Sequence, residues 1–187
     1  MTGRIVGPHR DVKPLGDKGL DACWADLAGG DAAKAWQAIL ALAARPEQAV
    51  PLLRQRLRPH PPLPPQRLAG LLADLDSDSF RAREQASKEL AALGAVAGPA
   101  LRQLHASAPS PEVQRRVEKL LGKPGQEGIL SEELRCIRAL EVLEYLATPE
   151  ARKLLAALAE GEPASPLTQG AKAALDRLSK RPGPTQP

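Results

Sequence analysis

Residues 78–94 have the sequence DSFRAREQASKELAALG, and this stretch decides the fold class. Its apolar residues recur at spacings of three and four, which places them on one face of an α-helix. They are Ala82, Ala86, Leu90 and Leu93. Short polar residues at 76–79 precede the stripe, and Gly94 follows it as a helix stop. We therefore predict a helix that begins after residues 76–79 and ends at Gly94.

The composition extends this prediction to the whole chain. Ala and Leu, both strong helix formers, contribute 62 of the 187 residues, whereas Val, Ile and Thr contribute 15. Because strands favour β-branched and aromatic residues, and only 2% of residues are aromatic, a mainly β fold is excluded. The 19 prolines indicate many short helices rather than a few long ones. We predict an all-α protein of about ten short helices.

Several of the predicted helices begin with the same local signal. Pro followed by Glu occurs at 46–47, 111–112 and 149–150. Pro at a helix start loses no hydrogen bond, and Glu in the first turn lies near the positive end of the helix dipole. Asp31 and Ser131 are predicted to cap two further helices. Repeated signals at similar spacing indicate stacked helical hairpins.

Apolar spacing also predicts which side chains enter the core. In the helix after Asp31 these are Trp36, Ile39, Leu40 and Ala43. In the long helix after Ser131 they are Leu134, Ile137, Leu140, Leu143 and Leu146. We expect Trp24 and Trp36 to anchor the core of the first hairpin.

The predicted helical domain spans residues 19–180. Residues 1–18 show no helical period and are expected to form a flexible N-terminal arm, and the Pro-rich residues 181–187 a disordered tail. Within the domain, a Pro-rich connection at 59–65 and a Gly-rich connection at 122–130 are expected to link helices.

The helix at 78–94, followed by GPAL at residues 98–101, resembles the two helices of a HEAT repeat. A similar second-helix sequence, PEQAVPLL, occurs at 46–53, and Pro51 and Pro99 lie 48 residues apart, near the ~40–47-residue HEAT period. Residues 138–155 resemble the bilin-lyase-like subclass. The resemblance implies a right-handed α-solenoid of antiparallel hairpins that binds partners without catalysis.

Residues 24–29 (WADLAG) and 31–35 (DAAKA) resemble helical segments that accompany β-propeller regions in large bacterial proteins. This likeness implies that the partner is a protein or another domain of a longer polypeptide. Residues 1–19 contain no apolar stretch of signal-peptide length, and the longest apolar run, 38–44, is far shorter than the ~20 residues that span a bilayer. We therefore expect a cytoplasmic protein that does not bind membranes.

The residue types that carry catalysis or metal binding are scattered. Cys23 and Cys136 belong to no metal-ligand pattern, and the three His residues are isolated. The acidic residues at 74–78 have the spacing of a calcium loop, but Ser79 and Gln85 replace the Gly and Glu that an EF-hand requires. We expect no enzyme activity, metal or cofactor.

Basic residues provide the candidate binding surface, with neighbouring residues expected to share helix faces. These residues are Arg54, Arg58, Arg115, Lys119, Arg135 and Arg138. The net charge is only +4 and acidic residues are interspersed, so an ordinary solvated surface accounts for them as well. Arg83 matches a HEAT position that usually bonds within the array, and we interpret it as structural.

Three functions remain open. The first is a non-catalytic protein–protein interaction scaffold of HEAT-repeat type. The alternative is a nucleic-acid-binding HEAT-like protein, similar to the HEAT-type DNA glycosylases, that uses the basic helix faces. The third, a bilin-lyase-like chaperone, rests on the repeat subclass alone. The chain has only four aromatic residues with which to stack on bases, which favours the scaffold.

Overall fold

The computed structural model describes residues 12–107, 110–122 and 128–181, and within them the chain forms ten α-helices, one short 3-10 helix and no strand. This confirms the all-α prediction. The elements are α1 (Asp17–Ala28), α2 (Ala32–Ala43), α3 (Pro46–Arg56), α4 (Pro65–Asp74), α5 (Phe80–Leu93), η1 (Gly94–Val96), α6 (Gly98–Ser107), α7 (Pro111–Leu121), α8 (Ile129–Leu146), α9 (Pro149–Ala159) and α10 (Pro166–Lys180).

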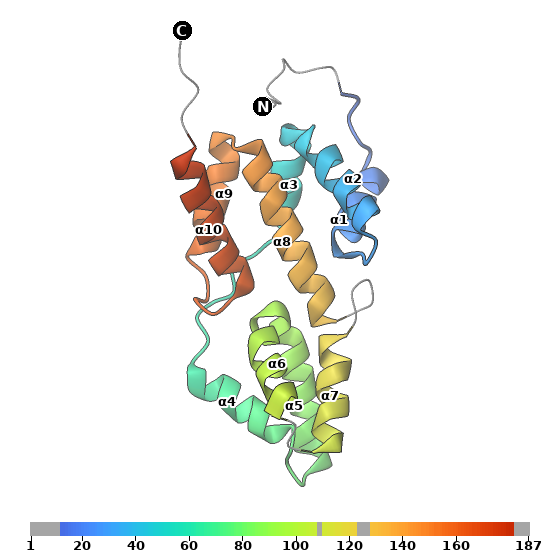
Figure 1. Cartoon of the computed structure of the whole chain (residues 1–187), viewed down its shortest axis with the longest axis vertical. Helices are drawn as coiled ribbons and strands as arrows, with labels where there is room; N and C mark the ends of the chain where they lie inside the picture. The colour runs from blue at the N-terminus through green and yellow to red at the C-terminus, as the bar shows by residue number, and fades with distance from the viewer. Residues whose placement is uncertain (1–11, 108–109, 123–127, 182–187) are drawn as a thin grey trace.

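The helices form two groups along the long axis of the molecule (Figure 1). We call α1–α3 with α8–α10 the upper lobe, and α4–α7 with η1 the lower lobe. Each lobe has its own cluster of buried apolar side chains. The chain passes from the upper to the lower lobe through residues 57–64 and returns with α8. The lower lobe is therefore inserted between the two halves of the upper lobe.

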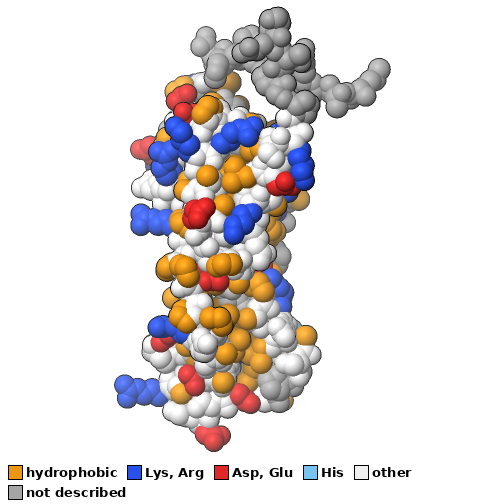
Figure 2. Space-filling model, turned by 90° about the vertical axis from the view of Figure 1, so that its left-hand side faces the viewer, with side chains coloured by type: hydrophobic (Ala, Val, Ile, Leu, Met, Phe, Trp, Pro, Cys, Tyr) orange, Lys and Arg blue, Asp and Glu red, His pale blue; other side chains and the backbone are white. Residues whose placement is uncertain are grey.

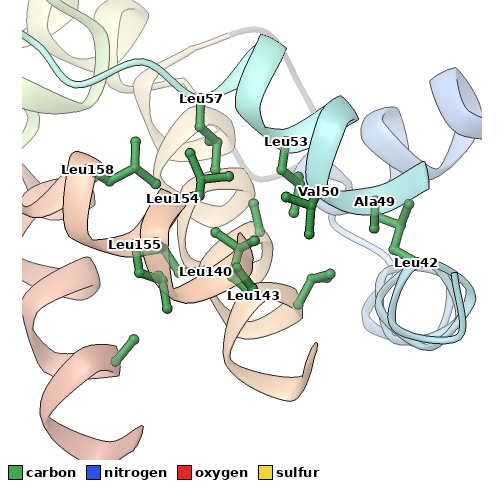
Figure 3. Close-up of a cluster of buried hydrophobic side chains, with 14 of the residues drawn as sticks. Leu42, Ala49, Val50, Leu53, Leu57, Leu140, Leu143, Leu154, Leu155 and Leu158 are labelled. Atoms are coloured by element: carbon green, nitrogen blue, oxygen red, sulfur yellow. The ribbon is translucent and has the colours of Figure 1, made fainter. Parts of the chain in front are cut away.

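Helix α8, the longest element, organises the upper lobe by packing against α1, α2, α9 and α10. Its Leu140 and Leu143 lie among apolar side chains of α2, α3 and α9 (Figure 3). Gly170 lets α10 approach closely, because a Cβ there would lie only 2.6 Å from Cδ1 of Leu140. Leu140 is 5% exposed, as the apolar stripe predicted.

Consecutive helices contact one another in both lobes, as helical hairpins do. Helices distant in sequence are also brought together, because α1 and α2 contact α8, and α3 contacts α9. A right-handed solenoid therefore stays a prediction. The domain limits also stay predictions: residues 1–11 of the expected arm and 182–187 of the expected tail lie outside the described residues, and α1 begins at Asp17.

The predicted helix starts are largely confirmed. Pro46, Pro111 and Pro149 each open a helix with Glu in its first turn. Asp31 caps α2, since its Oδ1 accepts hydrogen bonds from the backbone N–H of Ala33 at 2.9 Å and of Lys34 at 3.1 Å. The Ser131 cap is wrong. Helix α8 begins earlier, at Ile129, whose buried side chain joins the core of the lower lobe.

The predicted buried face of α2 is confirmed at Ile39 and wrong at Trp36 and Leu40, which are exposed, while Ala43 is partly buried. The buried side chains are Ala35, Ala38, Ile39 and Leu42, whereas the prediction was Trp36, Ile39, Leu40 and Ala43. Small Ala side chains allow α2 to approach its neighbours closely, and the larger Trp36 and Leu40 therefore point outward. Ile137 of α8, also expected inside, is 56% exposed. Trp24 packs against the upper core while remaining partly exposed.

Candidate interaction surface

The six predicted basic residues lie on four segments and in both lobes. Arg54 is exposed on α3, but Arg58 does not share its helix face because α3 ends at Arg56. Arg115 and Lys119 are exposed one turn apart on α7, as expected. On the side of α9, α10 and α4, Lys and Arg side chains alternate with Asp and Glu over the upper lobe, and apolar side chains gather below them (Figure 2).

The two basic residues of α8 make internal contacts. The guanidinium of Arg138 donates hydrogen bonds to the carbonyl oxygens of Leu27 and Gly29, both at 2.8 Å, and so ties the end of α1 to α8. Arg135 pairs with Glu132 and lies over the ring of Trp24, at 5.1 Å from its centroid. Both side chains therefore support the packing of α1 on α8.

A different surface lies where α2 and α8 run side by side in the upper lobe. Trp36 and Leu40 are one turn apart on α2, and Ile137, Glu141 and Tyr145 are successive turns of α8. These five residues form what we call the α2–α8 surface. The rings of Trp36 and Tyr145 meet edge to face, with centroids 6.0 Å apart and planes at 71°.

The exposure of these apolar side chains is concentrated. Trp36, Leu40, Ile137 and Tyr145 are 45%, 46%, 56% and 50% exposed. Among the described residues only Val12 and Phe80 are also large, apolar and exposed, so four of six such side chains lie on this one surface. Clustered rather than scattered exposure of large apolar groups marks binding surfaces, and aromatic residues dominate the energetics of such interfaces.

The C-terminal end of α10 borders the α2–α8 surface. A small pocket of 150 Å³ is lined there by Glu141, Glu144, Tyr145 and Arg181. Glu144 pairs with Arg177 at 2.7 Å and with Arg181 at 3.2 Å, and its hydrogen bond raises the pKa of Arg177. Helix α8 lies between α2 and α10 (Figure 1). The ion pairs of Glu144 therefore form a charged border on the α10 side of the α2–α8 surface.

The described residues contain no group of three His, Cys, Asp or Glu side chains able to hold a metal ion. Burial raises the pKa of the Cys136 thiol to about 11, which keeps it protonated and weakly nucleophilic. A cleft of 560 Å³ between the lobes is lined mainly by Ala and Gly, and its charged residues Glu132 and Arg135 bond to each other.

Sequence reasoning missed the α2–α8 surface because it placed Trp36, Leu40 and Ile137 in the core. One signal was available: within α2 only Lys34 and Gln37 are polar, so the helix has more apolar surface than one buried face requires. Periodicity alone does not decide which part of such a helix stays exposed.

Comparison with family models, with curated proteins and with solved structures finds no match for the chain. Along the described parts of the chain, every helix is too short or too polar to cross a lipid bilayer.

Proposed function

We propose that the chain is a non-catalytic protein-interaction scaffold of HEAT-like α-solenoid type, which binds a protein partner or another domain of a longer polypeptide through the α2–α8 surface. The observation that supports this most directly is the half-exposed Trp36–Tyr145 pair, with exposed Leu40 one helical turn from Trp36 and exposed Ile137 two turns from Tyr145. Rigid aromatic side chains gain apolar burial on binding and lose little conformational entropy, which makes them effective anchors in protein interfaces.

Two observations support the HEAT-like part of the proposal. Consecutive helices pair as hairpins. Nη1 of Arg83 donates hydrogen bonds to the carbonyl oxygens of Ser77 and Asp78, at 2.6 and 3.1 Å, and so closes the entry to α5. Arg83 therefore has an internal, structural role at the entry to its own helix. Successive hairpins held in this way would present a continuous surface to a partner.

The charges favour a protein over a nucleic acid as the partner of this surface. A single-stranded nucleic acid needs cations for its phosphates beside aromatic rings for its bases. Here the aromatic pair lies beside the carboxylate of Glu141, and the guanidinium of Arg138 is held by backbone carbonyls. The exposed pair Arg115 and Lys119 lies on α7, in the other lobe.

Site-specific photo-crosslinking in the native host tests the proposal. We expect p-benzoylphenylalanine at position 40 to capture a discrete protein adduct, since Leu40 borders the aromatic pair. The same group at Lys153, exposed on α9 and free of ion pairs with described residues, is the matched control and should capture none. The double change Trp36→Ala and Tyr145→Ala should remove the adduct.

The double variant should stay folded, because both side chains are about half exposed. Circular dichroism and a thermal melt check this before the adducts are compared. No adduct at position 40, equal adducts at both positions, or an adduct that survives the double change would each overturn the proposal.

A further inference from the structure

Glu141 is the one charged residue within the α2–α8 surface. It lies one helical turn from Ile137 and one turn from Tyr145, so apolar side chains precede and follow it on the same face of α8. Its carboxylate makes no ion pair and no hydrogen bond with any described residue. It also lines the small pocket that Tyr145 and Arg181 share.

The nearby cations do not neutralise Glu141. Arg138, less than one turn away on α8, donates to the carbonyl oxygens of Leu27 and Gly29. Arg181, in the shared pocket, donates to the carboxylate and the backbone carbonyl of Glu144, and Arg177 donates to the same carboxylate. Among the described residues, no cation therefore bonds to Glu141.

A partner that covers Trp36 and Tyr145 would also cover Glu141. Removing an ionised carboxylate from water without a partner charge is costly, whereas a close cation with good hydrogen bonds offsets that cost. The partner must therefore bring a positive charge to the middle of its apolar contact surface. The need for a cation discriminates among apolar partners, because a partner that lacks the cation would lose binding free energy.

The spacing of these residues favours a helix as the bound segment. They recur every four residues, at 137, 141 and 145 of α8 and at 36 and 40 of α2, and the two rows meet at the Trp36–Tyr145 pair. An amphipathic helix presents side chains at the same spacing toward one face. We infer that the partner's binding segment is an amphipathic helix whose apolar face carries a single Lys or Arg that pairs with Glu141; this rests on the proposed function.

A second copy of this chain is a poorer occupant. A symmetric pair centred on the α8 row would place Glu141 beside its own copy, because a two-fold axis brings identical residues together. Two carboxylates in the middle of an apolar contact repel each other, and the described cations beside Glu141, Arg138 and Arg181, already bond to other groups. The charge that selects a basic helix therefore opposes self-association through this row.

Selection from a library of displayed helices tests the inference on the full chain. The probe is a phage library of 20-residue Ala-based helices, randomised at every position of one face. We expect selected helices to carry apolar residues at helical spacing around one Lys or Arg. Selection on Glu141→Arg should replace that residue with Asp or Glu. Glu118→Arg, a matched reversal of an exposed glutamate on α7, should leave the preference unchanged.

The affinities of the selected helices then measure how much the pairing of Glu141 with the helix cation contributes to binding. A Lys-bearing helix should bind Glu141→Gln about tenfold more weakly than the original chain, and an acidic helix should bind Glu141→Arg best. Selection that needs Trp36 and Tyr145 but shows no charge preference would overturn the inference and leave the proposed function standing. Selection of no helix, or selection indifferent to both aromatic residues, would overturn both. A dimer that Trp36→Ala dissolves would assign the surface to a second copy.

Discussion

Leu140 and Leu40 are the same residue type in opposite environments. Leu140, on α8, is 5% exposed and fits against Gly170 of α10, while Leu40, on α2, is 46% exposed on the α2–α8 surface. Removing a buried leucine loses its transfer free energy and leaves a cavity that a close-packed interior fills only partly. Removing an exposed leucine leaves no cavity, so the same substitution should differ between the two sites.

We expect Leu140→Ala to lower the free energy of unfolding by ~2–5 kcal/mol, and Leu40→Ala by less than ~1 kcal/mol. Urea denaturation followed by circular dichroism measures both. Equal losses would show that α2 buries the face predicted from sequence rather than the observed one. Position 40 should nevertheless be the site that captures a protein adduct in the crosslinking experiment.

Burial of the Cys136 thiol predicts that it reacts more slowly in the native protein than in the unfolded chain. Its pKa is raised from 9.0 to about 11, chiefly by desolvation and further by the nearby carboxylate of Glu132. Because the thiolate is the reactive form, we expect slow reaction with a disulfide reagent at pH 8 in the native protein. Reaction in urea should be fast, and Cys23→Ala isolates the signal. Fast native reaction at pH 8 would show that the thiol is accessible and ionised.

The raised pKa also fixes the sign of a stability change. Above pH 9 the unfolded chain loses the Cys136 proton first, while the folded chain keeps it until about pH 11. The free energy of unfolding should therefore fall as the pH rises through this range. Cys136→Ala should lack this part of the fall. If the free energy of unfolding depended on pH identically in the original chain and in Cys136→Ala, the Cys136 thiol would be exposed to water rather than buried.

At the scale of the elements, helix caps allow a matched comparison. Asp31 at the start of α2 accepts two backbone hydrogen bonds, whereas Ser165 at the start of α10 accepts none. The Ser165 hydroxyl is buried and has no hydrogen-bond partner among the described residues. We expect Asp31→Ala to cost ~1 kcal/mol and Ser165→Ala to be neutral or stabilising. Thermal melts compare them, and a larger loss at Ser165 would contradict the geometry.

Local signals predicted the elements well because their causes lie within a few residues. Pro46, Pro111 and Pro149 act through their own backbone, and Asp31 through the two N–H groups that it reaches. Ser131 failed because the start of α8 is set by a distant contact: Ile129 packs into the lower lobe. Helix propensity and capping residues depend on neighbouring residues only, so they do not predict this contact with the lower lobe.

The faces of the helices were harder to predict than their positions. In α9 and α7 polar residues leave one apolar stripe, and its residues Leu155, Leu158, Val113 and Val117 are buried. In α2 apolar residues surround most of the helix, so the choice of buried face depends on fit with α8 rather than on period. The α2–α8 surface follows from that choice and was therefore beyond prediction from spacing.

At the scale of the whole molecule, the sequence order of helices differs from their spatial order. The segments at 46–53 and 78–101, whose sequences resemble HEAT helices, would be consecutive in a repeat array, yet α3 belongs to the upper lobe and α5 and α6 to the lower lobe. The repeat resemblance predicts hairpins, which are formed locally. It does not predict that α8 returns to complete the core begun by α1–α3, since that pairing joins residues more than a hundred positions apart.

Nucleic acid is the remaining rival, and salt distinguishes it. Binding through phosphates releases counterions and weakens steeply as salt rises. The exposed pair Arg115 and Lys119 is the best-placed cation pair, because neither forms an ion pair with a described residue. Yet the net charge is only +4, and the exposed aromatic pair lies in the other lobe. We therefore expect weak retention of DNA or RNA that is lost by about 150 mM salt.

Gel-shift titrations at several salt concentrations measure this retention, with Arg115→Glu combined with Lys119→Glu as the test variant. That variant should lose the low-salt binding without unfolding, while Trp36→Ala with Tyr145→Ala should leave it unchanged. Binding tighter than about 1 µM at about 150 mM salt, selective for a sequence or a lesion, would require base contacts as well as phosphate contacts. Such a result would reject the protein scaffold and assign the basic face of α7 the leading role.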